Sequence, residues 1–145
     1  MGAKVTPNFS NGMKLADRAA ERSNDPNTKC GAVIFDSKGN YVSSGCNRFP
    51  KGVAEDERMN DRALKNEIVV HSEPVAIFLA GHRSIGGTMY VSRFPCCRCA
   101  GLIIECGITR VVTREPSGEF AERWGESVAL AKKMFDEAGV ELYTV

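Results

Sequence analysis

The sequence predicts an α/β domain built around a five-stranded mixed sheet. Two apolar runs separated by a polar turn, residues 32–35 and 41–47, are typical of a β-hairpin, whose strands are antiparallel. The succession of strand, helix and strand over residues 88–113 predicts a right-handed parallel crossover, and residues 140–145 supply the last strand. A sheet that contains both kinds of pairing is mixed.

The N-terminal half begins with an expected loose tail over residues 1–9. A first helix is expected from Ser10 or Asn11 to about Arg22, because apolar residues recur there at helical spacing. Residues 48–66 are highly charged and show no clear period, so we expect a long loop there. Such a loop either forms part of a substrate lid or a subunit contact, or is a solvated surface excursion.

The C-terminal half alternates helices with strands. A helix is expected over residues 71–80, with Pro74 tolerated because it lies in the first turn. The next helix begins at Pro95 and ends at Gly107, in the position where helices favour a left-handed cap. The last helix, residues 120–138, carries an apolar stripe made of Trp124, Val128, Leu130, Met134 and Phe135.

Composition indicates one soluble domain over residues 1–145, with 43% hydrophobic and 26% charged residues. No stretch of about 18 uncharged apolar residues occurs, so we expect no membrane span. The start of the chain lacks the apolar core of a signal peptide, and we expect a cytoplasmic location. A formal net charge of +1 is not the strongly basic charge that is typical of proteins that bind long nucleic acid, so we expect a small nucleotide as the partner.

Three candidate metal ligands and one candidate base lie in the middle of the sequence. His71, Cys96 and Cys99 supply one nitrogen and two sulfur atoms, the number of ligands that a catalytic zinc takes from a protein while a fourth position stays open for water. Glu73 lies two residues beyond the histidine, so it can project beside the metal without binding it. The sequence thus predicts a catalytic Zn²⁺ site with Glu73 as its general base.

The two cysteine ligands are expected at the start of a helix. Residues i and i+3 share a helix face, and the free backbone N–H groups of a first turn stabilise thiolates. Cys97 lies between the two ligands, and the preceding proline favours Cys96 over it as the ligand. Cys30, Cys46 and Cys106 lie in apolar segments and are expected to be reduced core residues.

The pattern His-x-Glu followed by Pro-Cys-x-x-Cys is the signature of zinc-dependent nucleobase deaminases. On these residues and on the segments 25–34, 44–53 and 106–112, the chain resembles the cytidine and deoxycytidylate deaminase superfamily. Within that superfamily it is most similar to the deoxycytidylate deaminases. The resemblance covers roughly residues 14–113 and implies the three-layer α/β/α cytidine-deaminase fold.

The resemblance also implies an activity and roles for further residues. The implied reaction is hydrolytic deamination of dCMP to dUMP and ammonia by zinc-activated water, with Glu73 as proton shuttle. Asn47 is the position expected to hydrogen-bond the sugar, and the backbone of Ser72 is expected to border the base. The 5′-phosphate requires a charged donor, for which the basic candidates are Lys29, Arg48, Lys51 and Arg114.

One departure from the superfamily concerns base selectivity. Ser72 stands where alanine is usual, and Pro74-Val75-Ala76 follows the glutamate in place of an asparagine-alanine pair. The alternative function is therefore a related deaminase that acts on a C5-modified cytosine nucleotide, a free nucleoside or base, or tRNA adenosine. The alternative outside the enzymes is a structural zinc-binding module, which would need a fourth ligand that only Cys97 could supply.

The resemblance finally implies features of assembly and regulation. We expect a homo-oligomer, with a hexamer as one form that it could take. dCTP as activator and dTTP as inhibitor are the implied effectors. His82, the other histidine, is expected to be exposed.

Overall fold

The computed structural model describes residues 8–145 and contains one mixed sheet with helices on both faces. The expected tail at residues 1–9 lies outside the described residues except for its end, where Phe9 is buried and packs on Tyr90 and Tyr143. In chain order the elements are α1 (Ser10–Glu21), β1 (Gly31–Phe35), β2 (Tyr41–Cys46), η1 (Glu57–Asn60), α2 (Arg62–Ile68), α3 (Ser72–Ala80), η2 (Gly81–Ser84), β3 (Thr88–Val91), α4 (Cys97–Glu105), β4 (Arg110–Thr113), α5 (Gly118–Ala138) and β5 (Glu141–Thr144).

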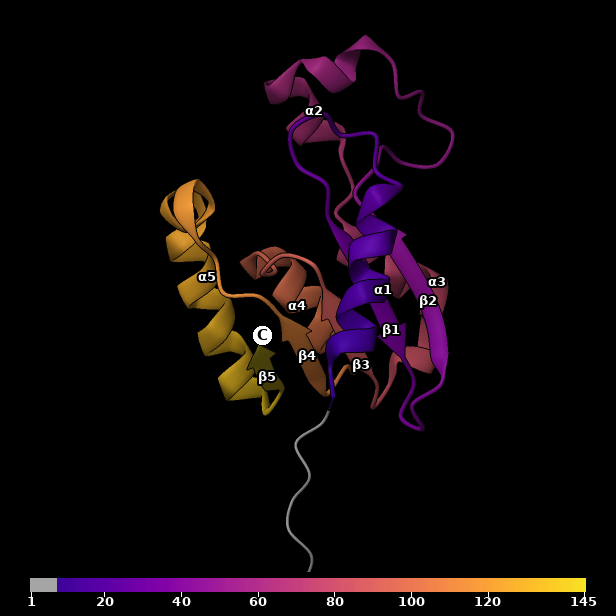
Figure 1. The fold of residues 1–145 in the computed structure, drawn as a ribbon, viewed down its shortest axis with the longest axis vertical. Coiled ribbons are helices and arrows are strands. Elements are labelled where there is room, and N and C mark those ends of the chain that lie inside the picture. The colour runs from indigo at the N-terminus through magenta and orange to yellow at the C-terminus, as the bar shows by residue number, and fades with distance from the viewer. Residues whose placement is uncertain (1–7) are drawn as a thin grey trace, which may run out of the picture.

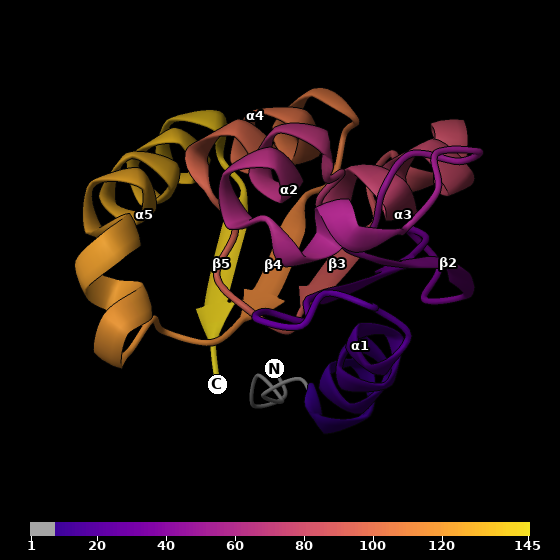
Figure 2. The same cartoon turned by 90° about the horizontal axis from the view of Figure 1, so that it is seen from above.

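The sheet has five strands, as the sequence predicts, and their order is β2-β1-β3-β4-β5. β1 pairs antiparallel with β2 and with β3, whereas β3, β4 and β5 run parallel. The expected hairpin and the expected parallel connection through α4 are both present. α1 covers one face of the sheet, and α3, α4 and α5 cover the other (Figures 1 and 2).

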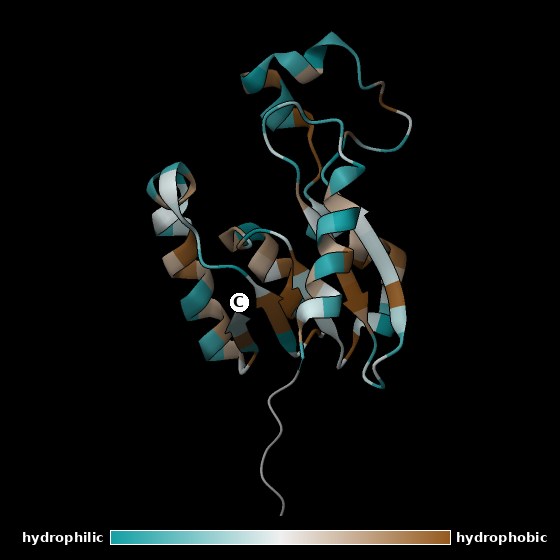
Figure 3. Ribbon diagram, in the orientation of Figure 1, coloured by the Kyte–Doolittle hydropathy of each residue, from teal (hydrophilic) through white to brown (hydrophobic). Residues whose placement is uncertain are grey.

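The core lies between the sheet and the three helices α3, α4 and α5. The strands are the most apolar part of the chain, as their brown colour in Figure 3 shows. Three side chains of this core, Met89, Ile103 and Phe135, have almost no exposed surface. α5 buries only part of its predicted stripe, because Leu130 is half exposed and Trp124 lies at the surface.

The charged segment after β2 differs from the expected loop because it contains two short helices, η1 and α2. Each helix is started by an aspartate: the side chain of Asp56 accepts a hydrogen bond from the backbone N–H of Arg58, and that of Asp61 accepts one from Leu64. The segment projects beyond the end of the sheet in Figure 1 and is mostly hydrophilic in Figure 3.

No helix in the described part of the chain, residues 8–145, is long and apolar enough to cross a membrane. The cytoplasmic location expected from the sequence stays a prediction. Gly107 follows α4 with a φ of +89°, as expected for a left-handed helix end. His82 lies exposed in η2, also as expected.

Candidate metal centre and nucleotide cavity

The first side of the site is the start of α3. His71 is the residue before the helix, and Ser72 and Glu73 form its first turn. α3 can pack closely on β2 because position 45 is a glycine: a Cβ atom there would lie 2.7 Å from the carbonyl oxygen of Ser72. This close approach brings His71 and Glu73 to the sheet edge at which β2 ends.

The second side of the site is the start of α4. Cys96 precedes the helix and its sulfur accepts a hydrogen bond from the backbone N–H of Cys99 at 3.5 Å. The i, i+3 spacing places both thiols at the same helix end, as predicted. The backbone N–H of Cys97 donates instead to Oγ of Ser127 on α5, so α5 also fixes this helix start.

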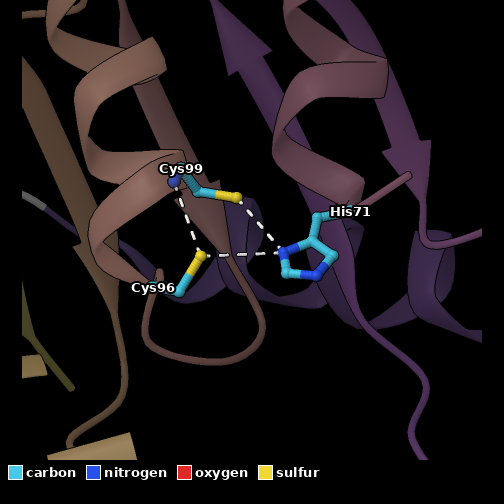
Figure 4. A group of neighbouring side chains, drawn as sticks. All are labelled: His71, Cys96 and Cys99. Atoms are coloured by element: carbon cyan, nitrogen blue, oxygen red, sulfur yellow. Dashed lines mark hydrogen bonds between the residues drawn. The ribbon is translucent and has the colours of Figure 1, made fainter. Parts of the chain in front are cut away.

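His71, Cys96 and Cys99 come together in one group whose ligand atoms all lie within 4.8 Å of one another (Figure 4). Nδ1 of His71 lies 3.7 Å from Sγ of Cys96 and 3.3 Å from Sγ of Cys99. Tetrahedral zinc with ordinary Zn–S and Zn–N bond lengths separates its nitrogen and sulfur ligands by about 3.6 Å. The three side chains therefore fit a zinc ion, and Cys97 is not part of the group.

The electrostatics of the two thiols also suit a metal. Hydrogen bonds with Cys99, and then with His71, lower the pKa of Cys96 to about 4 although the thiol is partly buried. The hydrogen bond with Cys96, together with burial, raises the pKa of Cys99. Cys96 is thus the thiolate of the pair, and a cation that binds both sulfurs deprotonates the second.

Glu73 is buried beside this group, and it is the acid or base that the sequence predicts. Burial raises the pKa of its carboxyl group, and the nearby His71 charge opposes that rise. Oγ of Ser72 donates a hydrogen bond of 2.9 Å to Oε1 of Glu73. Ser72 is fully buried and its hydroxyl is used by this bond, so the side chain does not line the cavity described below.

Asn47 lies on the cavity wall with its amide engaged by the protein. Its Oδ1 accepts a hydrogen bond from the backbone N–H of Cys30, and its Nδ2 donates to the carbonyl of Thr28 and to Oδ2 of Asp25. One lone pair of Oδ1 remains for a sugar hydroxyl. The amide therefore shapes residues 25–30, in addition to the sugar contact that the resemblance implies.

A cavity of about 400 Å³ opens in front of His71, Glu73 and Cys96. The strand register explains its position, because Gly31 pairs with Cys46 and Ala32 pairs with Val91. The start of β1 and the ends of β2 and β3 therefore lie together, and the residues before β1 and after β2 and β3 leave the sheet at this edge. The other walls are α2 and the first three turns of α5.

Of the basic residues predicted to bind phosphate, none lines this cavity. Lys29 and Arg114 line a second cavity of about 360 Å³, which shares Arg93, Phe94 and Phe120 with the first. The first cavity is lined by four cationic residues that the sequence analysis did not single out: Arg62, Lys65, Arg93 and Arg123. Lys65 forms an ion pair with Asp25, whereas the three arginines form no ion pair within residues 8–145.

Three nitrogen and sulfur ligands beside a buried carboxylate, at one edge of a mixed sheet, define the class of zinc-dependent nucleobase deaminases. The family model described as the cytidine and deoxycytidylate deaminase zinc-binding region matches residues 8–115. The chain belongs to this family.

Individual relatives agree with that assignment. The chain is 36% identical over 129 residues to the "uncharacterized deaminase in luxG 3′ region" of Aliivibrio fischeri, with 89% of this chain and 87% of that protein covered. It is 34% identical over 135 residues to the deoxycytidylate deaminase of Homo sapiens, covering 88% of this chain and 74% of that protein. The dCMP deaminase of cyanophage S-TIM5, solved with dCMP and dUMP, has the same fold, with a TM-score of 0.73, 22% identity and coverage of 98% and 100%.

Proposed function

We propose that the protein is a zinc-dependent deaminase that converts dCMP and water to dUMP and ammonia. The observation that carries this proposal is the group of His71, Cys96 and Cys99 beside the buried Glu73, with His71, Cys96 and Glu73 lining a cavity of nucleotide size. The relatives named deoxycytidylate deaminase support dCMP as the substrate.

In this proposal His71, Cys96 and Cys99 hold the zinc ion, and Glu73 moves the protons. When bound, zinc lowers the pKa of a coordinated water and so supplies a nucleophile at neutral pH. Glu73 takes up the proton that the water releases. Its carboxyl group then delivers this proton to N3 of the cytosine, takes the second proton of the water from the hydroxyl group now on C4, and passes it to the amino group, which leaves C4 as ammonia.

The remaining walls hold the nucleotide. Asn47 offers its free lone pair to a sugar hydroxyl, and the backbone at Ser72 borders the base. The three arginines, which have no ion pair within residues 8–145, give the cavity positive charge for the 5′-phosphate. Each guanidinium group can donate two parallel hydrogen bonds to two phosphate oxygens. Lys29 remains a proposed ligand for a phosphate that reaches toward the neighbouring cavity.

Two alternatives are less well supported. A structural zinc module closes its metal with four protein ligands, but the group found within residues 8–145 has three. A preference for C5-modified cytosine was expected from Ser72, but that hydroxyl is turned to Glu73 and is absent from the cavity wall. That preference, like action on a nucleoside, a free base or tRNA adenosine, stays a prediction for the substrate panel below.

Assembly and regulation extend the proposal. Phe78 on α3 is 81% exposed, and Leu79 beside it and Leu102 on α4 are also exposed. Apolar side chains on adjacent helices favour contact with a second copy, so we propose a homo-oligomer, for which light scattering after gel filtration gives the mass. dCTP and dTTP are the proposed effectors, as the family resemblance implies.

The test is to incubate zinc-loaded protein with dCMP, deoxycytidine, CMP and 5-methyl-dCMP in parallel, and to follow the ultraviolet change of cytosine to uracil. Rapid turnover of dCMP with slow turnover of deoxycytidine is the expected result. Zinc-bound protein that leaves every cytosine substrate unchanged would overturn the proposal. Adding dCTP or dTTP to the dCMP reaction tests the effectors in the same experiment.

A further inference from the structure

α2 has few of the apolar contacts that usually hold a helix in place. Its only buried residue is Lys65; of its two large apolar residues, Leu64 is exposed and Ile68, at the last position, is half-buried. A helix of 7 residues is too short to be stable alone in water. What attaches α2 to the protein must therefore be sought in the contacts of Lys65.

Lys65 makes two short contacts with the segment that precedes β1. Its Nζ lies 2.9 Å from Oδ1 of Asp25 and 2.8 Å from Oδ1 of Asn27. The side chains of the ion pair are only 3% and 5% exposed. Asp25 also accepts hydrogen bonds from the backbone N–H groups of Asn27 and Thr28 and from the side-chain amide of Asn47. These bonds hold the carboxylate in place independently of Lys65.

One face of α2 is turned to the nucleotide cavity. Arg62, Lys65, Asn66 and Val69 all line the cavity, and their spacing of i, i+3, i+4 and i+7 places them on a single helix face. The face thus presents one guanidinium that has no ion pair among residues 8–145, and one amide, to a ligand. If α2 moves away, the cavity loses this wall.

The chain on either side of α2 is held independently of Lys65. Before it, Phe49 and Met59 are buried. After it, Val70 exchanges two backbone hydrogen bonds with Arg48, which fixes the chain next to His71. We therefore expect loss of the lysine contact to release α2 while the metal ligands stay in place.

We propose that the Lys65–Asp25 ion pair is a latch that holds α2 against the nucleotide cavity, which makes Lys65 a positioning residue for substrate binding. The expected effect on substrate binding rests on the proposed function, whereas the expected attachment of α2 does not. Its signature is weaker binding of the nucleotide with unchanged chemistry at the metal.

The structural test is hydrogen exchange on the zinc-loaded protein without substrate. Two variants remove the latch: Lys65→Met, and Lys65→Met with Asp25→Asn, which leaves no unpaired buried charge if the first variant fails to fold. Arg110→Met with Glu141→Gln is the matched control, because it removes an exposed ion pair of 3.0 Å between β4 and β5 that borders neither cavity.

We expect the amides of residues 62–68 to exchange about tenfold faster or more in the latch variants, with β1, β3 and β4 as protected as in the wild type. The control should leave α2 unchanged. Exchange of residues 62–68 at the wild-type rate in the double variant would overturn the latch, as would acceleration spread evenly over the whole protein. This readout stands even if dCMP is not the substrate.

The kinetic test uses dCMP at fixed zinc content. We expect KM to rise about tenfold in the latch variants while kcat stays within about twofold, which is the pattern for lost substrate binding. The control variant should keep both constants. A fall in kcat at unchanged KM would show that the pair acts on the metal centre, and would overturn the proposed role in substrate positioning.

Discussion

The hydroxyl of Ser72 donates a hydrogen bond of 2.9 Å to Oε1 of Glu73, and both residues are buried at the start of α3. The bond restricts the rotation of the carboxylate that the proposed mechanism uses. We therefore expect Ser72 to be a positioning residue for the proposed base, a role that alanine at this position could not have.

Replacing Ser72 by alanine should lower kcat for dCMP by about threefold to tenfold. This corresponds to only part of the free energy that a hydrogen bond to a charged group contributes. KM and zinc content should not change. Ser84→Ala is the control, since Ser84 is an equally buried serine whose hydroxyl bonds the carbonyls of Gly81 and Cys106. Equal kcat in the wild type and Ser72→Ala would show that the hydroxyl does not support the reaction.

Replacing Glu73 by glutamine should abolish turnover while zinc stays bound. General acid–base catalysis contributes about 10²-fold to 10⁴-fold, so kcat should fall by at least that range. Metal analysis and the ultraviolet assay measure the two effects on one sample. Glu119→Gln removes another carboxylate of the same cavity and should keep most of the activity; residual turnover in Glu73→Gln near that of the control contradicts the assignment.

The three cysteines at the start of α4 should differ in their effect on the metal. Cys96→Ala and Cys99→Ala should each lose stoichiometric zinc, because two remaining ligands do not hold a catalytic zinc site. Cys97→Ala should keep one zinc per chain, since Cys97 is not part of the ligand group. Zinc content after dialysis is the measurement, and loss of zinc from Cys97→Ala alone would reverse the assignment of ligands.

The ligand group could be predicted from sequence because its geometry is local. His71 and Glu73 are fixed by one helix start, and Cys96 and Cys99 by another, so spacing along the chain determines which side chains can meet. The hairpin and the crossover were also predictable, because apolar runs of strand type mark them.

The α2 wall could not be predicted in the same way. α2 has almost no apolar periodicity, and its buried polar contacts join Lys65 to Asp25 and Asn27, which lie 40 and 38 positions away in the sequence. The i, i+3, i+4, i+7 spacing of Arg62, Lys65, Asn66 and Val69 was present in the sequence, but it marks a cavity face and not a core face. The arginines of the cavity were missed for a related reason, since a charged side chain gives no sequence signal of what it faces.

The buried ion pair should make stability depend on pH. Burial raises the pKa of Asp25, but hydrogen bonds from Lys65 and from the backbone of Asn27 and Thr28 outweigh this, so its pKa lies below the ordinary value of 3.8. A carboxylate with a lowered pKa stabilises the fold above its unfolded-state pKa, and this stabilisation is lost as the pH falls through the folded-state pKa.

Asp25→Asn should therefore be less stable than the wild type at pH 7, by up to about 3–5 kcal/mol, because Lys65 keeps its charge without its partner. The difference should persist at pH 5 and shrink as the pH falls below 3.8, where the wild-type carboxylate also becomes protonated. Urea unfolding at pH 7, 5 and 3 measures it. A difference of the same size at all three values would show that Asp25 does not act through its charge.

Arg93 should distinguish a nucleotide from a nucleoside. It follows β3 only three residues before Cys96, and it borders both cavities, with its guanidinium 5.7 Å from the centre of the Phe120 ring. The aromatic contact orients the side chain without neutralising its charge. Arg93 can therefore contact the phosphate whether the phosphate lies in the first cavity or extends toward Lys29.

Arg93→Ala should lower kcat/KM for dCMP by about tenfold to a hundredfold, as expected for losing one charge-assisted contact of about 1.5–3 kcal/mol. The value for deoxycytidine, which has no phosphate, should stay within about twofold. Arg98→Ala is the control, because Arg98 is exposed on α4 and lines neither cavity. Lys29→Ala should have the smaller effect, since Lys29 borders only the second cavity; equal losses for dCMP and deoxycytidine in Arg93→Ala would exclude phosphate recognition by this residue.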